Sequence, residues 1–255
     1  GSNKVIRKKE LEFHNYGYET DGQISLLVSN SMFSCTDGHL NGKLESETLY
    51  SENGNRQYEV DYSYGKQQTP VYYLVCVPNF LPLRPMDHYR DLKYDVALLN
   101  KNVTWCYLTK KKETFYDING SNPWSKVTNY TYDSSNYQVS EQTVSDGLNT
   151  QKTKYWYPST SGNKSAGLSN LTSKNCLSEV TAIDQYRNSK YTGGSRYDYT
   201  ANNNLPVVSK CYSILPDNST VLQMTVTGYD SYGNIREYQK MDGTPVTIIW
   251  SYNHQ

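Results

Sequence analysis

Tyrosines recur two residues apart along this chain, in the pairs Tyr16 and Tyr18, Tyr62 and Tyr64, Tyr130 and Tyr132, Tyr155 and Tyr157, and Tyr197 and Tyr199. Residues i and i+2 of a strand lie on the same face of a sheet, so each pair places two rings side by side. The chain holds 26 tyrosines among 255 residues, and the steps between the starts of successive pairs are close to multiples of roughly 23 residues. A unit of that length holds one hairpin. The spacing therefore predicts a β-repeat protein.

Turn signals support the same prediction. Asn-Gly and Asp-Gly steps favour two-residue hairpin turns, because both central residues must reach positive φ. They occur at Asp21-Gly22, Asp37-Gly38, Asn41-Gly42, Asn53-Gly54, Asn119-Gly120, Asp146-Gly147 and Asp242-Gly243. We expect an all-β fold of consecutive antiparallel hairpins that form an extended or curled repeat sheet, with little helix.

The strand-like runs between these turns give expected boundaries. We predict strands over 5–14, 43–50, 57–64, 105–116, 124–132, 136–144, 150–157, 205–213, 221–229, 235–241 and 245–252. The prolines of Pro78 to Pro85 predict an irregular connector. Ser159 to Lys174 is typical of a long loop, with a short helical turn expected within Leu168 to Leu177. This loop suggests an N-terminal array over 1–158, a connector over 159–176 and a C-terminal array over 177–255, with one continuous domain as the alternative.

Charge and hydropathy narrow the possible partners. Lys plus Arg and Asp plus Glu are equal, at 25 each, and no basic stripe stands out. We therefore expect no nucleic-acid binding. The longest apolar stretch, Val71 to Val77, is far shorter than the about 20 residues that span a bilayer, so we expect no membrane insertion by this segment.

Residue types that carry catalysis or bind metals are sparse. The five cysteines lie far apart, without metal-ligand spacing, and are expected to be free thiols. The four histidines belong to no zinc motif, and Asp87-His88 lacks a nucleophile motif to complete a triad. We predict no metal, no cofactor and no catalytic residue, and hence no enzyme.

Two segments carry a recognisable motif. Tyr229-Asp230-Ser231-Tyr232-Gly233-Asn234 is followed by Asp242-Gly243 and Trp250-Ser251-Tyr252, and Tyr132-Asp133 is followed by Asp146-Gly147 and Tyr155-Trp156-Tyr157. This pattern resembles the YD repeats of the rearrangement-hotspot (RHS) family of bacterial surface proteins. The resemblance implies a bacterial extracellular or cell-surface location and a sheet of stacked hairpins. It assigns structural repeat positions to Tyr132, Asp133, Asp146, Gly147, Tyr229, Asp230, Asp242, Gly243 and Tyr252.

Three functions remain open from the sequence. The first is a non-enzymatic structural or interaction segment, whose partners are other segments of the same longer protein, a surface protein or a glycan. The second is a carbohydrate-binding module, with Trp124, Trp156, Tyr155 and Tyr157 as candidate binding residues, because exposed rings stack on sugars. The third is a glycosidase-like enzyme, which needs two carboxylates close together in a cleft.

Overall fold

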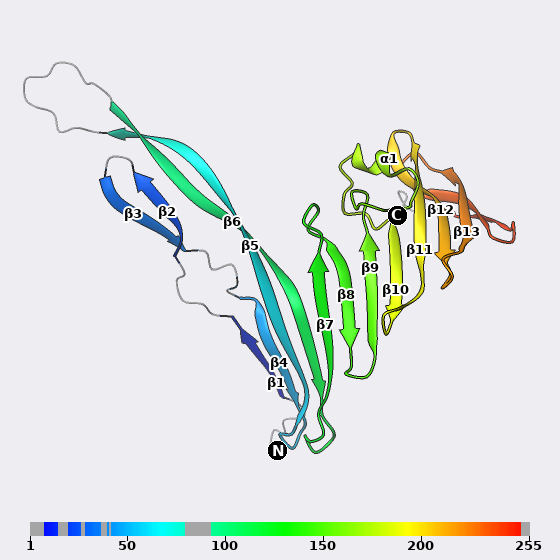
Figure 1. The fold of residues 1–255 in the computed structure, drawn as a ribbon, viewed down its shortest axis with the longest axis horizontal. Coiled ribbons are helices and arrows are strands. Elements are labelled where there is room, and N and C mark those ends of the chain that lie inside the picture. The colour runs from blue at the N-terminus through cyan, green and yellow to red at the C-terminus, as the bar shows by residue number, and fades with distance from the viewer. Residues whose placement is uncertain are drawn as a thin grey trace, which may run out of the picture. The chain divides into compact units, whose positions relative to one another are not determined.

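The computed structural model describes residues 8–14, 20–26, 29–36, 40, 42–79 and 93–250, with side chains described over 8–14, 40, 42–67, 69 and 104–250. The described chain is mostly antiparallel strand, which confirms the predicted all-β class (Figure 1). Thirteen strands follow one hydrogen-bonded order, β1-β4-β5-β6-β7-β8-β9-β10-β11-β12-β13-β14-β15. Among the described residues, no helix has the length and apolarity needed to cross a membrane.

The chain divides into two compact units, of which the first comprises residues 1–111 and 115–123. Its strands are β1 (Lys8–Phe13), β2 (Thr20–Leu26), β3 (Ser29–Thr36), β4 (Leu44–Tyr50), β5 (Arg56–Asn79) and β6 (Lys93–Phe115), of which residues 112–114 belong to the second unit. Strand β4 lies between β1 and β5, and β2 pairs with both β3 and β6. Unit 1 is therefore a set of antiparallel pairs in which β5 and β6 are the longest strands.

The second unit comprises residues 112–114 and 124–255. Its strands follow one another in the sheet in chain order, as a meander visible from β7 to β13 in Figure 1. They are β7 (Trp124–Tyr132), β8 (Val139–Ser145), β9 (Thr150–Trp156), β10 (Ala182–Arg187), β11 (Lys190–Asn202), β12 (Leu205–Ile214), β13 (Thr220–Tyr229), β14 (Ile235–Lys240) and β15 (Pro245–Thr247). The helix α1 (Leu168–Thr172) lies in the connection between β9 and β10.

Several predicted boundaries agree closely with the structure. The predicted strands 43–50, 124–132 and 150–157 correspond to β4, β7 and β9 within one residue. The helical turn expected within Leu168 to Leu177 is α1. These segments combine clear turn signals with aromatic or β-branched residues, so local pattern and tertiary pairing agree.

Other strand predictions were wrong. Strands β10 and β11 were not predicted, because their residues are polar and include the pair Gly193 and Gly194. Pairing with β9 and β12 overrides that weak local preference. Strand β5 continues through Pro78 to Asn79, where we expected the connector to begin. Asp21-Gly22 lies inside β2 and not at a hairpin turn, and β15 ends at Thr247 although we expected a strand to 252.

Three cysteines have described side chains, Cys106, Cys176 and Cys211, and all three are free and half-buried. Burial raises the pKa of the Cys106 and Cys211 thiols, which keeps them protonated near neutral pH.

The best-defined core of unit 2 lies beneath the loop between β9 and β10. Thr181 is 0 % exposed and Leu171 is 2 % exposed. The Ser165 hydroxyl donates to the Thr181 carbonyl oxygen at 2.9 Å, and the Tyr199 amide donates to the Ala166 carbonyl oxygen at 2.9 Å. The loop therefore joins the sheet by backbone as well as side-chain bonds, which satisfies polar groups that it buries.

Gly167 lets this loop approach β11. Its φ is +73°, and a Cβ there would lie 1.9 Å from the Tyr199 carbonyl oxygen. We expect Gly167→Ala to cost about 3 kcal/mol or more of unfolding free energy, since the left-handed backbone alone costs about 1–2 kcal/mol. Urea unfolding of the variant measures this cost.

Gly147→Ala is the matched control, because Gly147 also has positive φ but its added Cβ would meet nothing within 4 Å. We expect Gly147→Ala to lose only the part of the unfolding free energy that comes from placing alanine in a left-handed backbone conformation. Equal losses in the two variants would show that the loop does not press against β11.

Candidate functional site

Four tyrosine hydroxyls tie neighbouring strands together in the same way. Each donates to a backbone carbonyl oxygen at or near the start of the strand that precedes it in the sheet. We call these four bonds the hairpin clasps: Tyr64 to Leu44 (2.9 Å), Tyr157 to Val139 (2.7 Å), Tyr199 to Val180 (3.4 Å) and Tyr229 to Val208. The donor lies 20, 18, 19 and 21 residues after its acceptor, which is one hairpin of chain.

Burial keeps the clasp hydroxyls protonated. It raises the pKa of Tyr157 to about 12 and also raises the pKa values of Tyr64, Tyr199 and Tyr229. Desolvation disfavours the phenolate, so the hydroxyl remains a donor. The clasps are therefore insensitive to pH across the neutral range.

Aspartates close the turns at the ends of the hairpins. Asp117 accepts bonds from the Asn119 and Ser121 amides at 3.0 and 2.8 Å, and Asp230 accepts from the Tyr232 and Asn234 amides at 2.9 Å each. The repeat positions Asp133, Asp146 and Asp242 accept equivalent turn bonds. Gly147 and Gly243 have φ of 91° and 82° in two of these turns. The YD motif thus combines a strand-end tyrosine with a turn-capping aspartate. Repeat position Tyr252 lies outside the described residues.

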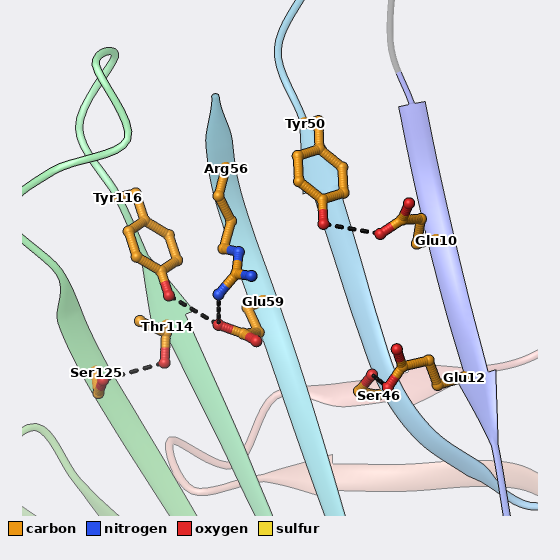
Figure 2. Close-up of polar contacts among 9 residues, drawn as sticks. All are labelled: Glu10, Glu12, Ser46, Tyr50, Arg56, Glu59, Thr114, Tyr116 and Ser125. Atoms are coloured by element: carbon orange, nitrogen blue, oxygen red, sulfur yellow. Dashed lines mark hydrogen bonds and ion pairs between the residues drawn. The ribbon is translucent and has the colours of Figure 1, made fainter. Parts of the chain in front are cut away.

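Figure 2 shows a second use of tyrosine hydroxyls in unit 1. The Tyr50 hydroxyl donates to Glu10 Oε2, and the Tyr116 hydroxyl donates to Glu59 Oε2, each at 2.7 Å. Arg56 Nη1 also donates to Glu59 Oε2, at 3.1 Å. Bonds from Lys8 and from Tyr50 hold the pKa of Glu10 below its usual range. Both glutamates accept hydrogen bonds from tyrosines that lie beside them in the sheet.

The aromatic residues proposed for sugar binding are distributed over different surfaces. Tyr157 is 4 % exposed, and Trp124 is 49 % exposed at the start of β7. Tyr155 and Trp156 are adjacent in β9 and therefore face opposite sides of the sheet. The structure therefore does not bring the four residues together. Trp156 lines a hollow in unit 2.

That hollow lies over strands β9 to β12 and has a volume of about 350 Å³. We call it the Trp156 hollow; its side chains that carry the argument are Trp156, Ala182, Asp184, Tyr186, Tyr191 and Arg196. Register explains its shape. Buried Ala182 pairs with Trp156 on one side and with Arg196 on the other, so a small residue lies between two large ones.

Polar and ring contacts fix the walls of the Trp156 hollow. The indole Nε1 donates to Asp184 Oδ2 at 2.7 Å, and Lys154 Nζ lies 3.9 Å from the centre of the Trp156 ring. Tyr186 and Tyr191 meet edge to face, with ring centres 5.4 Å apart. Sequence reasoning missed Asp184, Tyr186 and Tyr191 as neighbours of Trp156, because they come from strands β10 and β11, which we did not predict.

No group of three or more His, Cys, Asp or Glu among the described residues is placed to hold a metal ion. Asp184 is the single carboxylate lining the Trp156 hollow there, and it is bonded to the indole. Asp87-His88 lies outside the described residues.

Comparison with known proteins gave no relative: neither a protein-family model nor a curated protein matches this chain.

The Tyr157 clasp makes a direct prediction for stability. We expect Tyr157→Ala to lose about 3–5 kcal/mol, the range for a buried aromatic side chain. Tyr157→Phe keeps the ring but leaves the Val139 carbonyl without its donor, so we expect a loss of about 1 kcal/mol. Chemical unfolding measures both.

Tyr232→Ala is the control, since Tyr232 is 66 % exposed, and it should change stability by about 0.5 kcal/mol at most. A Tyr157→Ala variant as stable as the control would contradict the burial.

The turn aspartates predict acid sensitivity. Hydrogen bonds from turn amides and hydroxyls lower the pKa values of Asp117, Asp133, Asp146, Asp217 and Asp242. A carboxyl group whose pKa is lower in the folded state than in the unfolded state stabilises the fold at pH values above its unfolded pKa, about 3.9. This stabilisation is lost as the pH falls through the pKa of the folded state. We therefore expect the melting temperature to fall steeply below about pH 4. Thermal melts from pH 7 to pH 2.5 measure this fall.

Asp146→Ala removes one of these caps, in which the Asn149 amide donates to Asp146 at 2.7 Å. The variant should start from a lower melting temperature and lose less of it between pH 4 and pH 2.5. A melting temperature that is the same at pH 2.5 and pH 7 in the wild type would refute the role of the caps.

Proposed function

We propose that this chain is a non-enzymatic structural segment of a bacterial extracellular or cell-surface YD-repeat protein, whose task is to carry a sheet of repeated hairpins. The observation that carries this proposal is the shared geometry of the four hairpin clasps, each of which joins a tyrosine to a carbonyl 18 to 21 residues earlier. A contact that is repeated in four separate hairpins serves the array and not a single site.

The Tyr229-Asp230 motif links this observation to the family resemblance. Tyr229 forms a clasp to Val208, and Asp230 caps the turn that follows it. Both residues of the motif thus bond to backbone groups, which any sequence supplies. A repeat that depends on backbone bonds tolerates variation at its other positions, as arrays of stacked units do.

The arrangement of carboxylates favours the structural role over the enzymatic alternative. The turn aspartates are occupied by amide donors, and Glu10 and Glu59 are occupied by tyrosine and basic side chains. A hydrolase needs carboxylates that face a substrate and hold different protonation states.

Further hairpins of a longer protein are the partners that fit this proposal. In the described part of the sheet, β1 pairs with β4 alone and β15 pairs with β14 alone, so both strands present an edge. An unpaired edge is a template for another strand.

Two measurements on the proposed function are decisive together. The purified chain should show no turnover on a panel of glycosides, esters and peptides, and an antibody to this segment should label intact cells of the bacterium that makes it. Turnover that survives purification and disappears on substitution of one Asp, Glu or His would replace the structural role with an enzymatic one. Labelling only after the cells are broken would contradict the surface location.

A further inference from the structure

We propose that the Trp156 hollow is a binding site for a small sugar that carries a carboxylate, of the uronic-acid class. This goes beyond the scaffold role, because a hairpin array needs no hollow. The argument uses the shape of the site, one orphaned donor, and the balance of charge.

The shape suits one or two sugar rings. A volume of about 350 Å³ lies at the small end of ligand pockets, which span about 300–1,000 Å³. Trp156 lies opposite Ala182 on β10, and Tyr186 lies four residues further along β10. At about 3.3 Å per residue, the two rings are therefore about 13 Å apart along the strand. Asp184 lies between them, so aromatic surface flanks a polar centre, as a sugar with apolar faces and polar edges requires.

Arg196 supplies the orphaned donor. Its Nε is buried without a hydrogen-bond partner, and no other buried side-chain nitrogen or oxygen among the described residues lacks one. Its ion-pair partner, Asp198 Oδ1, is 3.7 Å from Nε, which is beyond hydrogen-bond distance, and already accepts the Ala166 amide at 2.8 Å. An unsatisfied buried donor is costly, and a bound acceptor removes the cost. The guanidinium is held in place by stacking 4.5 Å from the centre of the Tyr212 ring.

Charge in and beside the hollow favours an anion. Lys164 lines the hollow, and Lys154 lies over the indole of Trp156. Neither lysine forms an ion pair with any residue whose side chain the structure describes. Lys152 also lies beside the site but is paired with Glu141 at 3.4 Å. Asp184 stays negative when it accepts from the neutral indole, and Arg196 is ion-paired with Asp198, so the net positive charge comes from Lys154 and Lys164. Arg196 adds a guanidinium to the wall, and guanidinium with carboxylate is a favoured pair.

Two matched pairs of sugars measure the contribution of the carboxylate to binding: galacturonic acid with galactose, and glucuronic acid with glucose. Titration of the full chain by calorimetry should show saturable binding of at least one uronic acid, at least about tenfold tighter than its neutral counterpart. In Arg196→Gln this preference should fall by about tenfold or more, as expected for loss of a charged hydrogen bond. Arg236→Gln, an exposed arginine on β14, should bind like the wild type.

Further variants keep the test informative if Arg196→Gln does not fold. Lys164→Gln changes an exposed lining residue and should weaken uronate binding without altering the neutral sugar. Trp156→Ala should weaken both members of a pair, whereas Trp124→Ala should weaken neither. The proposal is overturned if no probe binds, if the neutral sugars bind as tightly as the acids, or if acetate displaces the uronate at equal concentration.

Discussion

A tyrosine hydroxyl bonded to the backbone carbonyl of the preceding strand is the contact on which the rest of this sheet depends. A sheet of hairpins in sequence gives each strand few partners beyond its neighbours, and only a handful of the described residues are fully buried. Large rings supply the missing apolar contact, since each aromatic side chain buries about 150–250 Å². The hydroxyl at the end of the ring satisfies a carbonyl that the ring would otherwise desolvate. Buried Tyr157 and Tyr199 show both parts of this contact.

The other features follow from keeping that contact in register. A shift of one residue would move every clasp tyrosine to the opposite face, so the turns must fix the pairing. Aspartate caps and positive-φ glycines do this at the hairpin ends. Where the connection from β9 to β10 is long, the loop folds back and bonds to the backbone of Tyr157 and Tyr199. Gly162 and Lys164 of the same loop line the Trp156 hollow.

Local sequence predicts the hairpins where turn chemistry and aromatic alternation agree, as at β7 and β9. It fails at β10 and β11, because those strands are held by pairing with neighbours and carry glycines that indicate a loop. The same failure hides the hollow. Trp156 is visible in the sequence as an aromatic residue, but Asp184 and Arg196 gain meaning only when register places them beside it. The YD motif predicts which residues recur, and only the structure gives the reason: Tyr229 bonds to a carbonyl 21 residues earlier, and Asp230 caps the turn that follows it.

Spectrophotometric titration of the tyrosines tests the clasps most directly. Exposed phenols ionise near pH 10, whereas clasp phenols should ionise later or only as the protein unfolds. The account predicts a main transition near pH 10 and a separate late group that regains normal titration in denaturant. Tyr157→Phe should remove one tyrosine from the late group and none from the main transition. A single transition near pH 10 for all the tyrosines of the folded chain, unchanged by denaturant, would contradict buried clasps.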